Sequence, residues 1–461
     1  MADTRAEANT MALAFLRAER PRPDVVRTAR NGWWLAVGTV CLGAFMGQLD
    51  ASIVTLTYPA LRAAFDTSLA AVAWVSLAYL VTLVAVLIPA GRFADAHGRK
   101  LVYLHGFAVF TVASAACGLA PSLSWLVAFR VVQAVGAAML QANSVALVAV
   151  SAPRRAVRAA LGVQAAAQAV GLALGPTLGG LLVSTIGWRW VFGINIPVGV
   201  VAIVAGHYLL PRTRERTPVT RFDWPGLGLL ALAATSLLLA VSAVSGLGLP
   251  ALATAALFVA ALLAGHGFHR RQRTAAMPLV DLALVGTRPV GLGLVGALCG
   301  YLVLFGPLVL VPIVLAHRGP LTAGLVLTAL PAGFAVAAIL ADRVLPTRWT
   351  DRFRCTVGAV LCVAGLALVV PFGTGWLVAG LGVLGVGLGV FTPANNSMIM
   401  TSVPARAAGT GGGLVNLTRA LGTALGVALV TLALHLSASP LVAVGVLLAA
   451  AAAMVLVSRR T

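Results

Sequence analysis

The chain has 461 residues, of which 60% are hydrophobic and only 10% are charged. A soluble globular domain carries about a quarter charged residues, so this composition excludes a soluble fold and calls for a lipid solvent. The net charge of +20 does not indicate nucleic-acid binding, because the basic residues stand in short segments between long apolar runs.

Fourteen apolar runs are each long enough to cross a bilayer, which takes about 20 predominantly apolar residues. We therefore predict an all-α membrane protein with fourteen transmembrane helices. Residues 1–32 lack the apolar core of a signal peptide, so the first run is predicted to remain as a span. The predicted spans are 33–57, 71–91, 101–120, 123–148, 158–185, 189–210, 224–245, 250–268, 289–316, 321–345, 355–371, 375–400, 406–436 and 438–457.

The basic residues predict the orientation of these spans. If the N-terminus is cytoplasmic, 27 of the 32 basic residues fall in cytoplasmic segments, whereas Arg62, Arg189 and Arg318 fall outside. Cytoplasmic loops carry an excess of Lys and Arg. We therefore predict a multi-pass protein of the bacterial cytoplasmic (inner) membrane, with both termini in the cytoplasm.

The spans group as six, two and six. The two middle runs are rich in Leu and Ala and nearly free of polar side chains, which is typical of peripheral, lipid-facing helices. Two six-helix halves are the plan of many secondary carriers. The predicted divisions are a cytoplasmic segment 1–32, a first half 33–210, an insertion 211–288 with two extra helices and their flanking loops, and a second half 289–461.

Several function classes lack their signature residues. The five cysteines form no Cys-x-x-Cys and the seven histidines are scattered singly, so neither a metal site nor a membrane-embedded enzyme is predicted. The phosphate loop of an ATP-driven pump needs Gly-x-x-x-x-Gly-Lys followed by Ser or Thr, whereas Lys100 precedes Leu101. We therefore expect no cofactor, and an ion gradient as the energy source.

Asp50 is the only acidic residue well inside a predicted span, and Arg130 is the buried base of the same half. Each lies seven residues from the outer end of its span, about 10 Å deep at a rise of 1.5 Å per residue. An ionisable group inside a membrane is costly and marks a functional site by default. Two interpretations stay open: a structural ion pair, or a proton site at Asp50 tuned by burial and by Arg130 or a substrate.

Polar residues recur with a helical period on three spans, which turns one face of each helix away from lipid. Helix packing alone accounts for small and amide residues, but Arg130 and Arg419 favour a water-filled cavity. The candidate cavity-lining residues from these stripes are Gln133, Gln141, Gln164, Gln168, Asn416 and Arg419.

Two segments have the composition of packing or turn motifs. Gly91–Lys100 combines glycines with an acid and three bases after the second span, where a tight turn needs glycine. Its Asp95 can accept hydrogen bonds from a neighbouring helix N-terminus. Gly171–Gly180 lets backbones approach closely in the fifth span, which Pro176 is expected to kink.

These segments resemble the major facilitator superfamily, and more closely its fourteen-span drug:proton antiporters of the EmrB/QacA type. Gly91–Lys100 is similar to the loop signature between spans 2 and 3, and Gly171–Gly180 to the span-5 motif of antiporters. The resemblance adds Asn395 and Asn396 to the candidate cavity-lining residues. Weaker likenesses extend it over nearly the whole chain, at Leu49–Val54, Arg130–Gly136, Trp188–Pro197, Pro393–Asn396 and Asn416–Gly422.

The resemblance implies roles for these residues. Asp50 would be the coupling acid and Arg130 its partner in proton transfer. Two positions depart from the family pattern, because Ala96 replaces a basic residue of the loop and Ala134 replaces a glycine of the span-4 motif. The implied inner-gate loop comprises Gly91, Asp95, Gly98, Arg99 and Lys100, with Asp95 and Arg99 as its latch. The implied antiporter motif comprises Gly171, Gly175, Pro176, Gly179 and Gly180.

The sequence thus predicts a monomer that exports a lipophilic small molecule, such as an antibiotic, in exchange for protons by alternating access. With one intramembrane acid, a preference for dications is not expected, whereas Arg130 and Arg419 favour neutral or anionic compounds. The alternative in the same fold is proton-coupled uptake of a small organic solute, against which the span-5 motif argues.

Overall fold

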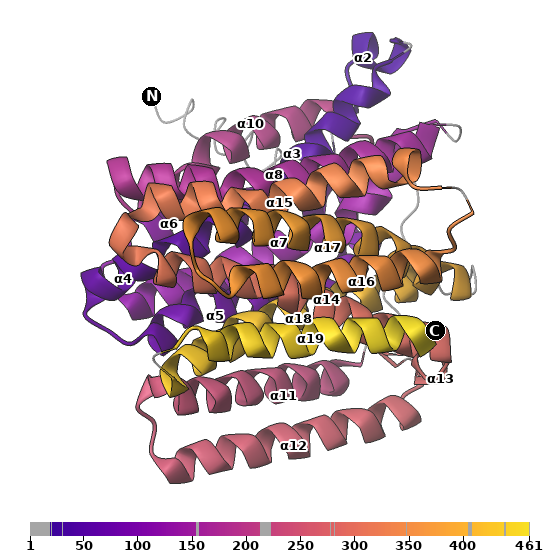
Figure 1. Cartoon of the computed structure of the whole chain (residues 1–461). Coiled ribbons are helices and arrows are strands. Elements are labelled where there is room, and N and C mark those ends of the chain that lie inside the picture. Colours follow the sequence, from indigo (N-terminus) through magenta and orange to yellow (C-terminus); the bar gives the residue numbers. More distant parts are fainter. Residues whose placement is uncertain are drawn as a thin grey trace, which may run out of the picture.

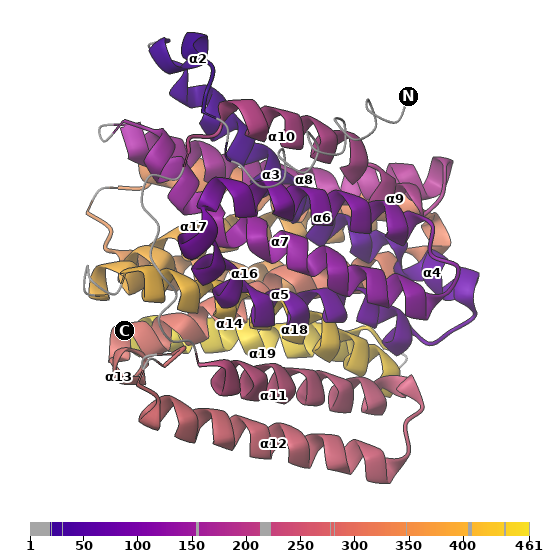
Figure 2. The same cartoon turned by 180° about the vertical axis from the view of Figure 1, so that it is seen from behind.

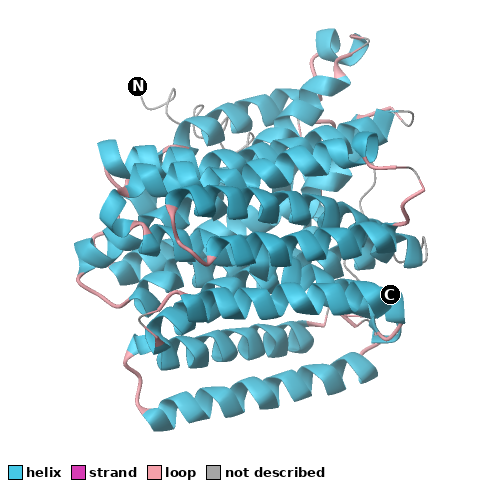
Figure 3. Cartoon of the chain, viewed as in Figure 1, coloured by secondary structure: helices cyan, strands magenta, loops and turns pink. Residues whose placement is uncertain are grey.

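The computed structural model describes residues 19, 21–29, 31–153, 156–212, 223–276, 278–280, 282–346, 348–403, 408–437 and 439–460. Within these residues all regular structure is helical (Figure 3). Fourteen helices in the described part of the chain are long and apolar enough to cross a membrane. The predicted all-α membrane fold with fourteen spans is confirmed, while most of segments 1–32 and 211–223 lies outside the described residues.

Two groups of six long helices form the body of the bundle (Figures 1 and 2). The first group is α3 (Trp33–Ile53), α5 (Leu69–His97), α6 (Arg99–Gly118), α7 (Leu123–Ser151), α8 (Val157–Thr185) and α10 (Asn195–Leu209). The second is α14 (Arg288–Val314), α15 (Pro320–Val344), α16 (Asp351–Val369), α17 (Thr374–Ser402), α18 (Ala408–Leu436) and α19 (Leu441–Arg460). The end at which α3 begins is called the near end, and the opposite end the far end.

The other described elements lie outside these two groups of six. They are α2 (Asp24–Thr28), η1 (Val54–Thr57), α4 (Tyr58–Phe65), α9 (Trp190–Gly193), α11 (Trp224–Ser242), η3 (Ala243–Leu247), α12 (Ala251–Thr274), α13 (Leu282–Val285) and η4 (Ala316–Arg318). The helices α11 and α12, the longest of these, lie along one edge of the bundle, and α12 is the outer of the two (Figure 1).

The first span is longer than predicted and changes helix type beyond its midpoint. The α-helix α3 passes into the 3-10 turn η1 and then into α4, so the span reaches Phe65 rather than residue 57. Hydroxyl groups account for the change, because Thr55 donates to the carbonyl of Ser52 at 2.9 Å and Thr57 to that of Val54 at 2.6 Å. Such bonds to the residue three positions earlier compete with the α-helical ladder.

The turn between α5 and α6 is much shorter than the predicted loop Gly91–Lys100. Helix α5 continues to His97 and α6 starts at Arg99, which leaves Gly98 with φ of 115° as the connecting residue. That angle explains the glycine, since side chains rarely tolerate it. The expectation that Gly91 is a turn residue is wrong, because Gly91 lies within α5, where an added Cβ would lie 3.7 Å from that of Ala142.

Helix α8 uses its small residues to pack against both groups. A Cβ atom at Gly171 or Gly175 would overlap α3, where Phe45 and Ser52 lie. On another face, a Cβ at Gly180 would meet the backbone of Pro320 at the start of α15. Small residues let membrane helices approach this closely, and α8 thereby joins the two groups at the far end.

The contact between α8 and α15 is close in the far half of both helices. A Cβ atom at Gly324 would overlap the carbonyl oxygen of Pro176. The hydroxyls of Thr177 and Thr328 are hydrogen-bonded to each other. Because these residues lie between the midpoint and the far end of both helices, the two groups are closed against each other there.

The two extra helices differ from each other, and one corrects the sequence interpretation. Helix α12 packs on α11 and is otherwise exposed, as a lipid-facing helix should be. Helix α11 instead packs against both α5 and α18, which belong to different groups. Its continuation η3 brings Gly246 against the ring of His435 on α18. Thus α11 covers the boundary between the two groups where α5 and α18 meet it. Its Leu- and Ala-rich surface can pack against helices as well as against lipid.

Asp223 ties these extra helices together at the near end. Its carboxylate caps α11 by accepting from the Gly226 amide at 3.1 Å, and also accepts from Arg271 at 2.8 Å and Gln272 at 3.0 Å. Burial raises the pKa of the Asp223 carboxyl, but these hydrogen bonds together lower it by more than burial raises it. The net pKa therefore lies below its ordinary value. The contact therefore adds its full contribution to the free energy of unfolding above about pH 4. That contribution is lost as the pH falls through the lowered pKa of Asp223 in the folded state.

The far-end closure yields a cross-linking prediction. A Thr177→Cys, Thr328→Cys double variant should form a disulfide on oxidation, since the two side chains touch. Adding Gly324→Val should push α15 off Pro176 and lower the cross-linked fraction. Overpacking costs about 1–3 kcal/mol, which shifts the closed-to-open ratio by about fivefold to a hundredfold.

The readout is the cross-linked peptide measured by mass spectrometry. Gly445→Val is the matched control, because a Cβ at Gly445 on α19 meets open space. An undiminished cross-link with Gly324→Val, or an equal loss with Gly445→Val, would show that Gly324 does not govern this closure.

Candidate functional site

A buried ion pair lies inside the first group of helices. Asp50 on α3 and Arg130 on α7 are joined at 2.6 Å between Oδ2 and Nη1, and their side chains are 0% and 1% exposed. The sequence predicted that Asp50 and Arg130 lie at the same depth, and in the structure they are in direct contact. A charge of either sign at this depth is stable only with its partner present.

Four further groups complete the hydrogen bonding of the pair. The other carboxylate oxygen of Asp50 accepts from Gln133 at 3.0 Å and from Asn195 on α10 at 3.2 Å. Gln133 also accepts from Arg130 at 2.6 Å and donates to the Ser114 hydroxyl at 2.8 Å. The Nε of Arg130 donates to the carbonyl of Val75 at 3.0 Å. Helices α3, α5, α6, α7 and α10 thus meet at one polar cluster.

This cluster can respond to a single proton. Protonating Asp50 would remove the counter-charge of Arg130 while leaving the guanidinium buried, which is the costly arrangement for an ion pair. Arg130 lies 4.1 Å from the ring centroid of Tyr79, and Tyr79 also lines the central cavity. A change at Asp50 therefore has a short physical route to that cavity, through one aromatic ring.

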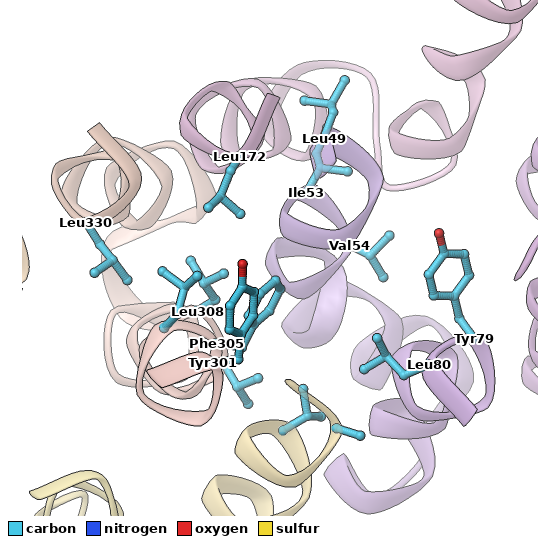
Figure 4. Close-up of a cluster of buried hydrophobic side chains, with 14 of the residues drawn as sticks. Leu49, Ile53, Val54, Tyr79, Leu80, Leu172, Tyr301, Phe305, Leu308 and Leu330 are labelled. Atoms are coloured by element: carbon cyan, nitrogen blue, oxygen red, sulfur yellow. The ribbon is translucent and has the colours of Figure 1, made fainter. Parts of the chain in front are cut away.

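The central cavity has a volume of about 560 Å³ and lies between the two groups. Its lining comes from the middle and near-end parts of seven helices, whereas α8 and α15 touch at the far end. Figure 4 shows Tyr301 and Phe305 of α14 turned toward α3, with Tyr79 on α5 beyond Val54. The cavity-lining residues are Gly47, Gln48, Ala51, Tyr79, Leu80, Leu83, Gln141, Ser144, Val145, Gln164, Gln168, Tyr301, Phe305, Asn396, Asn416, Arg419, Ala420 and Thr423.

Two candidate residues lie elsewhere. Gln133 belongs to the ion-pair cluster, because it stands one turn from Arg130 on the same face of α7. Asn395 points away from the cavity and donates to the carbonyl of Gly293 on α14 at 2.9 Å, whereas its neighbour Asn396 faces the cavity. The six candidates that line the cavity are Gln141, Gln164, Gln168, Asn396, Asn416 and Arg419.

Sequence reasoning missed several residues of the site. Asn195 and Ser114 complete the ion-pair cluster, and neither stands in a polar stripe that would single it out. Tyr79, Tyr301 and Phe305 line the cavity but occur in apolar runs, where aromatic residues are ordinarily core. Asn195 lies within Trp188–Pro197, so the family resemblance was the one available signal.

Of the expected inner-gate residues, the structure gives hydrogen-bond partners for Lys100. Lys100 is buried, and its Nζ donates to the carbonyls of His207 and Leu210 at 2.8 and 2.9 Å. These carbonyls end α10, where a cation is favourable. Lys100 thus packs within the first group. The side chain of Asp95 lies outside the described residues and Arg99 is half-buried, so the latch stays a prediction.

The ion pair yields a stability prediction. Arg130→Met or Asp50→Leu alone leaves a buried charge without its partner, which should cost about 3–5 kcal/mol. The double variant should regain most of that loss because no charge remains. The measurement is the thermal unfolding midpoint of purified protein in detergent, followed by tryptophan fluorescence.

Arg271→Met is the matched control, since its side chain is 43% exposed in the pair with Asp223. Because Arg271 is partly exposed and Asp223 keeps its hydrogen bonds to Gly226 and Gln272, this variant should cost less stability than either buried single variant. If the two buried single variants were no less stable than this control, the pair would not hold the first group together.

Comparison with known proteins gives the family. The sequence profile of the Major Facilitator Superfamily matches residues 40–427. A tetracenomycin C resistance and export protein of Streptomyces glaucescens is 33% identical over 402 residues, covering 86% of this chain and 74% of that protein. The riboflavin transporter RibZ of Clostridioides difficile is 31% identical over 408 residues, covering 86% of this chain and 87% of that protein.

The fold agrees with this match. A crystal structure of a POT peptide transporter in complex with sulfate superposes with a TM-score of 0.67, at 15% sequence identity, over 96% of each chain. That likeness concerns the fold alone. With the profile matched over most of its length and fourteen candidate spans, the chain belongs to the Major Facilitator Superfamily of membrane transporters.

Proposed function

We propose that this transporter exports a lipophilic small molecule in exchange for protons, as a member of the fourteen-span drug:proton antiporter branch. The observation that carries the proposal is the buried pair of Asp50 and Arg130, one aromatic ring away from a central cavity. The two helices inserted between the six-helix groups support the branch assignment. The export function in the name of the Streptomyces glaucescens relative agrees with the proposed direction.

The proposed location is the bacterial cytoplasmic membrane, with both termini and the near end in the cytoplasm. The excess of basic residues in near-end segments supports this orientation. In that orientation the cavity faces the cytoplasm and the contact of α8 with α15 closes the outside. The conformation is therefore the one that would load its substrate from the cytoplasm, in a transporter that works as a monomer.

The proposed cycle follows from the charge on Asp50. In the cytoplasm-facing state Asp50 is ionised and held by Arg130, Gln133 and Asn195. Substrate enters the cavity, the groups rock, and separation of α8 from α15 opens the outside. A proton from outside neutralises Asp50 and frees Arg130, which disturbs Tyr79 and the cavity and favours substrate release. Return to the cytoplasm-facing state then discharges the proton and restores the pair.

Uptake remains the second candidate. The relative named a riboflavin transporter shares 31% identity with this chain over nearly its whole length. The same cavity and ion pair would serve proton symport if substrate and proton bound together. Direction of flux separates the two functions, so riboflavin accumulation in right-side-out vesicles is the companion assay.

The test uses everted vesicles that hold an imposed pH gradient. A panel of lipophilic drugs is added, and proton release is followed with a pH-sensitive dye. We expect at least one drug to collapse the gradient with the wild type and not with Asp50→Asn. The matched control is Asp66→Asn, because Asp66 is exposed at the far end with φ of 44°, a conformation that Asn also accepts.

Two results would contradict the proposal. If Asp50→Asn coupled as well as the wild type, the acid would be structural and the proton site would lie elsewhere. If no drug released protons from the wild type while riboflavin accumulated in right-side-out vesicles, uptake would replace export.

A further inference from the structure

The cavity contains one charged side chain that the ion pair does not use. Among the described residues that line the cavity, Arg419 on α18 is alone in carrying a charge. No carboxylate lies within ion-pair distance of it in the described part of the chain. Its Nη1 lies 3.5 Å from the Asn416 oxygen, and its guanidinium lies 4.5 Å from the ring centroid of Tyr301. Arg419 is thus held in place by a ring and an amide, with its charge uncompensated.

Arg130 provides the contrast within the same protein. It has a carboxylate partner at 2.6 Å, is 1% exposed, and contacts the ring of Tyr79. Because Asp50 neutralises Arg130 in this conformation, the charge offered to a ligand is that of Arg419. A cation in a site shielded from water attracts an anion, and a guanidinium pairs with a planar acid through two parallel hydrogen bonds.

A second, independent group points to the same ligand. Gln164 on α8 lines the cavity on the side contributed by the first group and is only 3% exposed. Its Nε2 has no hydrogen-bond partner among the described residues. A buried amide nitrogen without an acceptor is unfavourable and is satisfied when an oxygen is brought to it. The cavity therefore presents a donor for a neutral oxygen as well as a cation for an acid.

The remaining lining sets the shape of the ligand. Tyr301 and Phe305 project from successive turns of α14 with their rings only 19° from parallel, and Tyr79 lies on the α5 side. Flat rings stack on such faces. A volume of about 560 Å³ falls within the range of pockets that enclose drug-sized molecules. Several side-chain carboxamides of the cavity lining can form hydrogen bonds with carbonyl and hydroxyl groups on the ligand.

We propose that the cavity binds planar, fused-ring aromatic compounds that carry one ionised acidic group and several carbonyl or hydroxyl oxygens. The acid lies at Arg419 and a ring oxygen accepts from Gln164. This assignment deepens the proposed function and rests on it, because it takes the central cavity as the transport site. A monoanion also suits export, since one proton inward for one anion outward moves two charges in the direction that the membrane potential favours.

The experiment measures binding of three matched probes to the purified full-length protein by quenching of tryptophan fluorescence. The probes are 4,5-dihydroxyanthraquinone-2-carboxylate, its neutral carboxamide, and the cationic aminomethyl compound on the same ring. The wild type should bind the carboxylate about tenfold more tightly than the carboxamide, and the cation most weakly. Equal or tighter binding of the cation would overturn the proposal without recourse to any variant.

Variants then assign the two contacts. Arg419→Gln should weaken the carboxylate about tenfold and leave the carboxamide within about twofold, whereas Arg419→Lys should keep the order of the probes. Gln164→Leu should weaken all three probes alike, because the ring oxygens are common to them. The control is Arg62→Gln, which removes one exposed positive charge at the far end and should change nothing. Equal weakening of carboxylate and carboxamide by Arg419→Gln would overturn the role of Arg419.

Failure here is distinguishable from failure of the export proposal. Charge-selective binding together with drug-independent proton movement would contradict antiport and leave this assignment intact. Proton release driven best by cationic compounds would support antiport and overturn the assignment.

Discussion

The arrangement of the first group depends on two opposite charges that cannot be solvated by lipid. Asp50 and Arg130 are stable at their depth only as a pair with every remaining hydrogen bond satisfied. Meeting that requirement draws in Gln133, Ser114 and Asn195 and so fixes how four helices face one another. The same requirement makes the cluster sensitive to one proton, because neutralising either charge leaves the other buried without its partner.

The ion pair and the far-end closure meet on α3. Two residues after Asp50, Ser52 packs against Gly175 of α8, so that even a methyl group at Gly175 would overlap it. The next residue of α8, Pro176, touches Gly324 of α15 in the other group. A rearrangement at Asp50 is therefore two helix contacts away from the surface that closes the far end. The 3-10 turn η1 follows α3 directly in the chain.

Hydropathy and residue spacing predicted the features that belong to a single helix. The fourteen spans follow from apolar length, and the shared depth of Asp50 and Arg130 follows from a fixed rise per residue. Periodicity shows which face avoids lipid, but not which neighbour that face meets. Gln133 therefore looked like a cavity residue and instead bonds within its own group. Asn395, which the family resemblance had suggested, likewise bonds within its own group. Tyr79 and Tyr301 were not singled out, because an aromatic ring in an apolar run has no distinguishing pattern.

The charge on Asp50 in this conformation is the most direct point at which to test the account. The measurement is an infrared difference spectrum between the purified, substrate-free wild type and Asp50→Asn at neutral pH. The account predicts that the wild type shows the additional bands of an ionised carboxylate, as the contact with Arg130 requires. An additional band of a protonated carboxyl group instead would contradict it, because Asp50 would then carry its proton before the far end had opened.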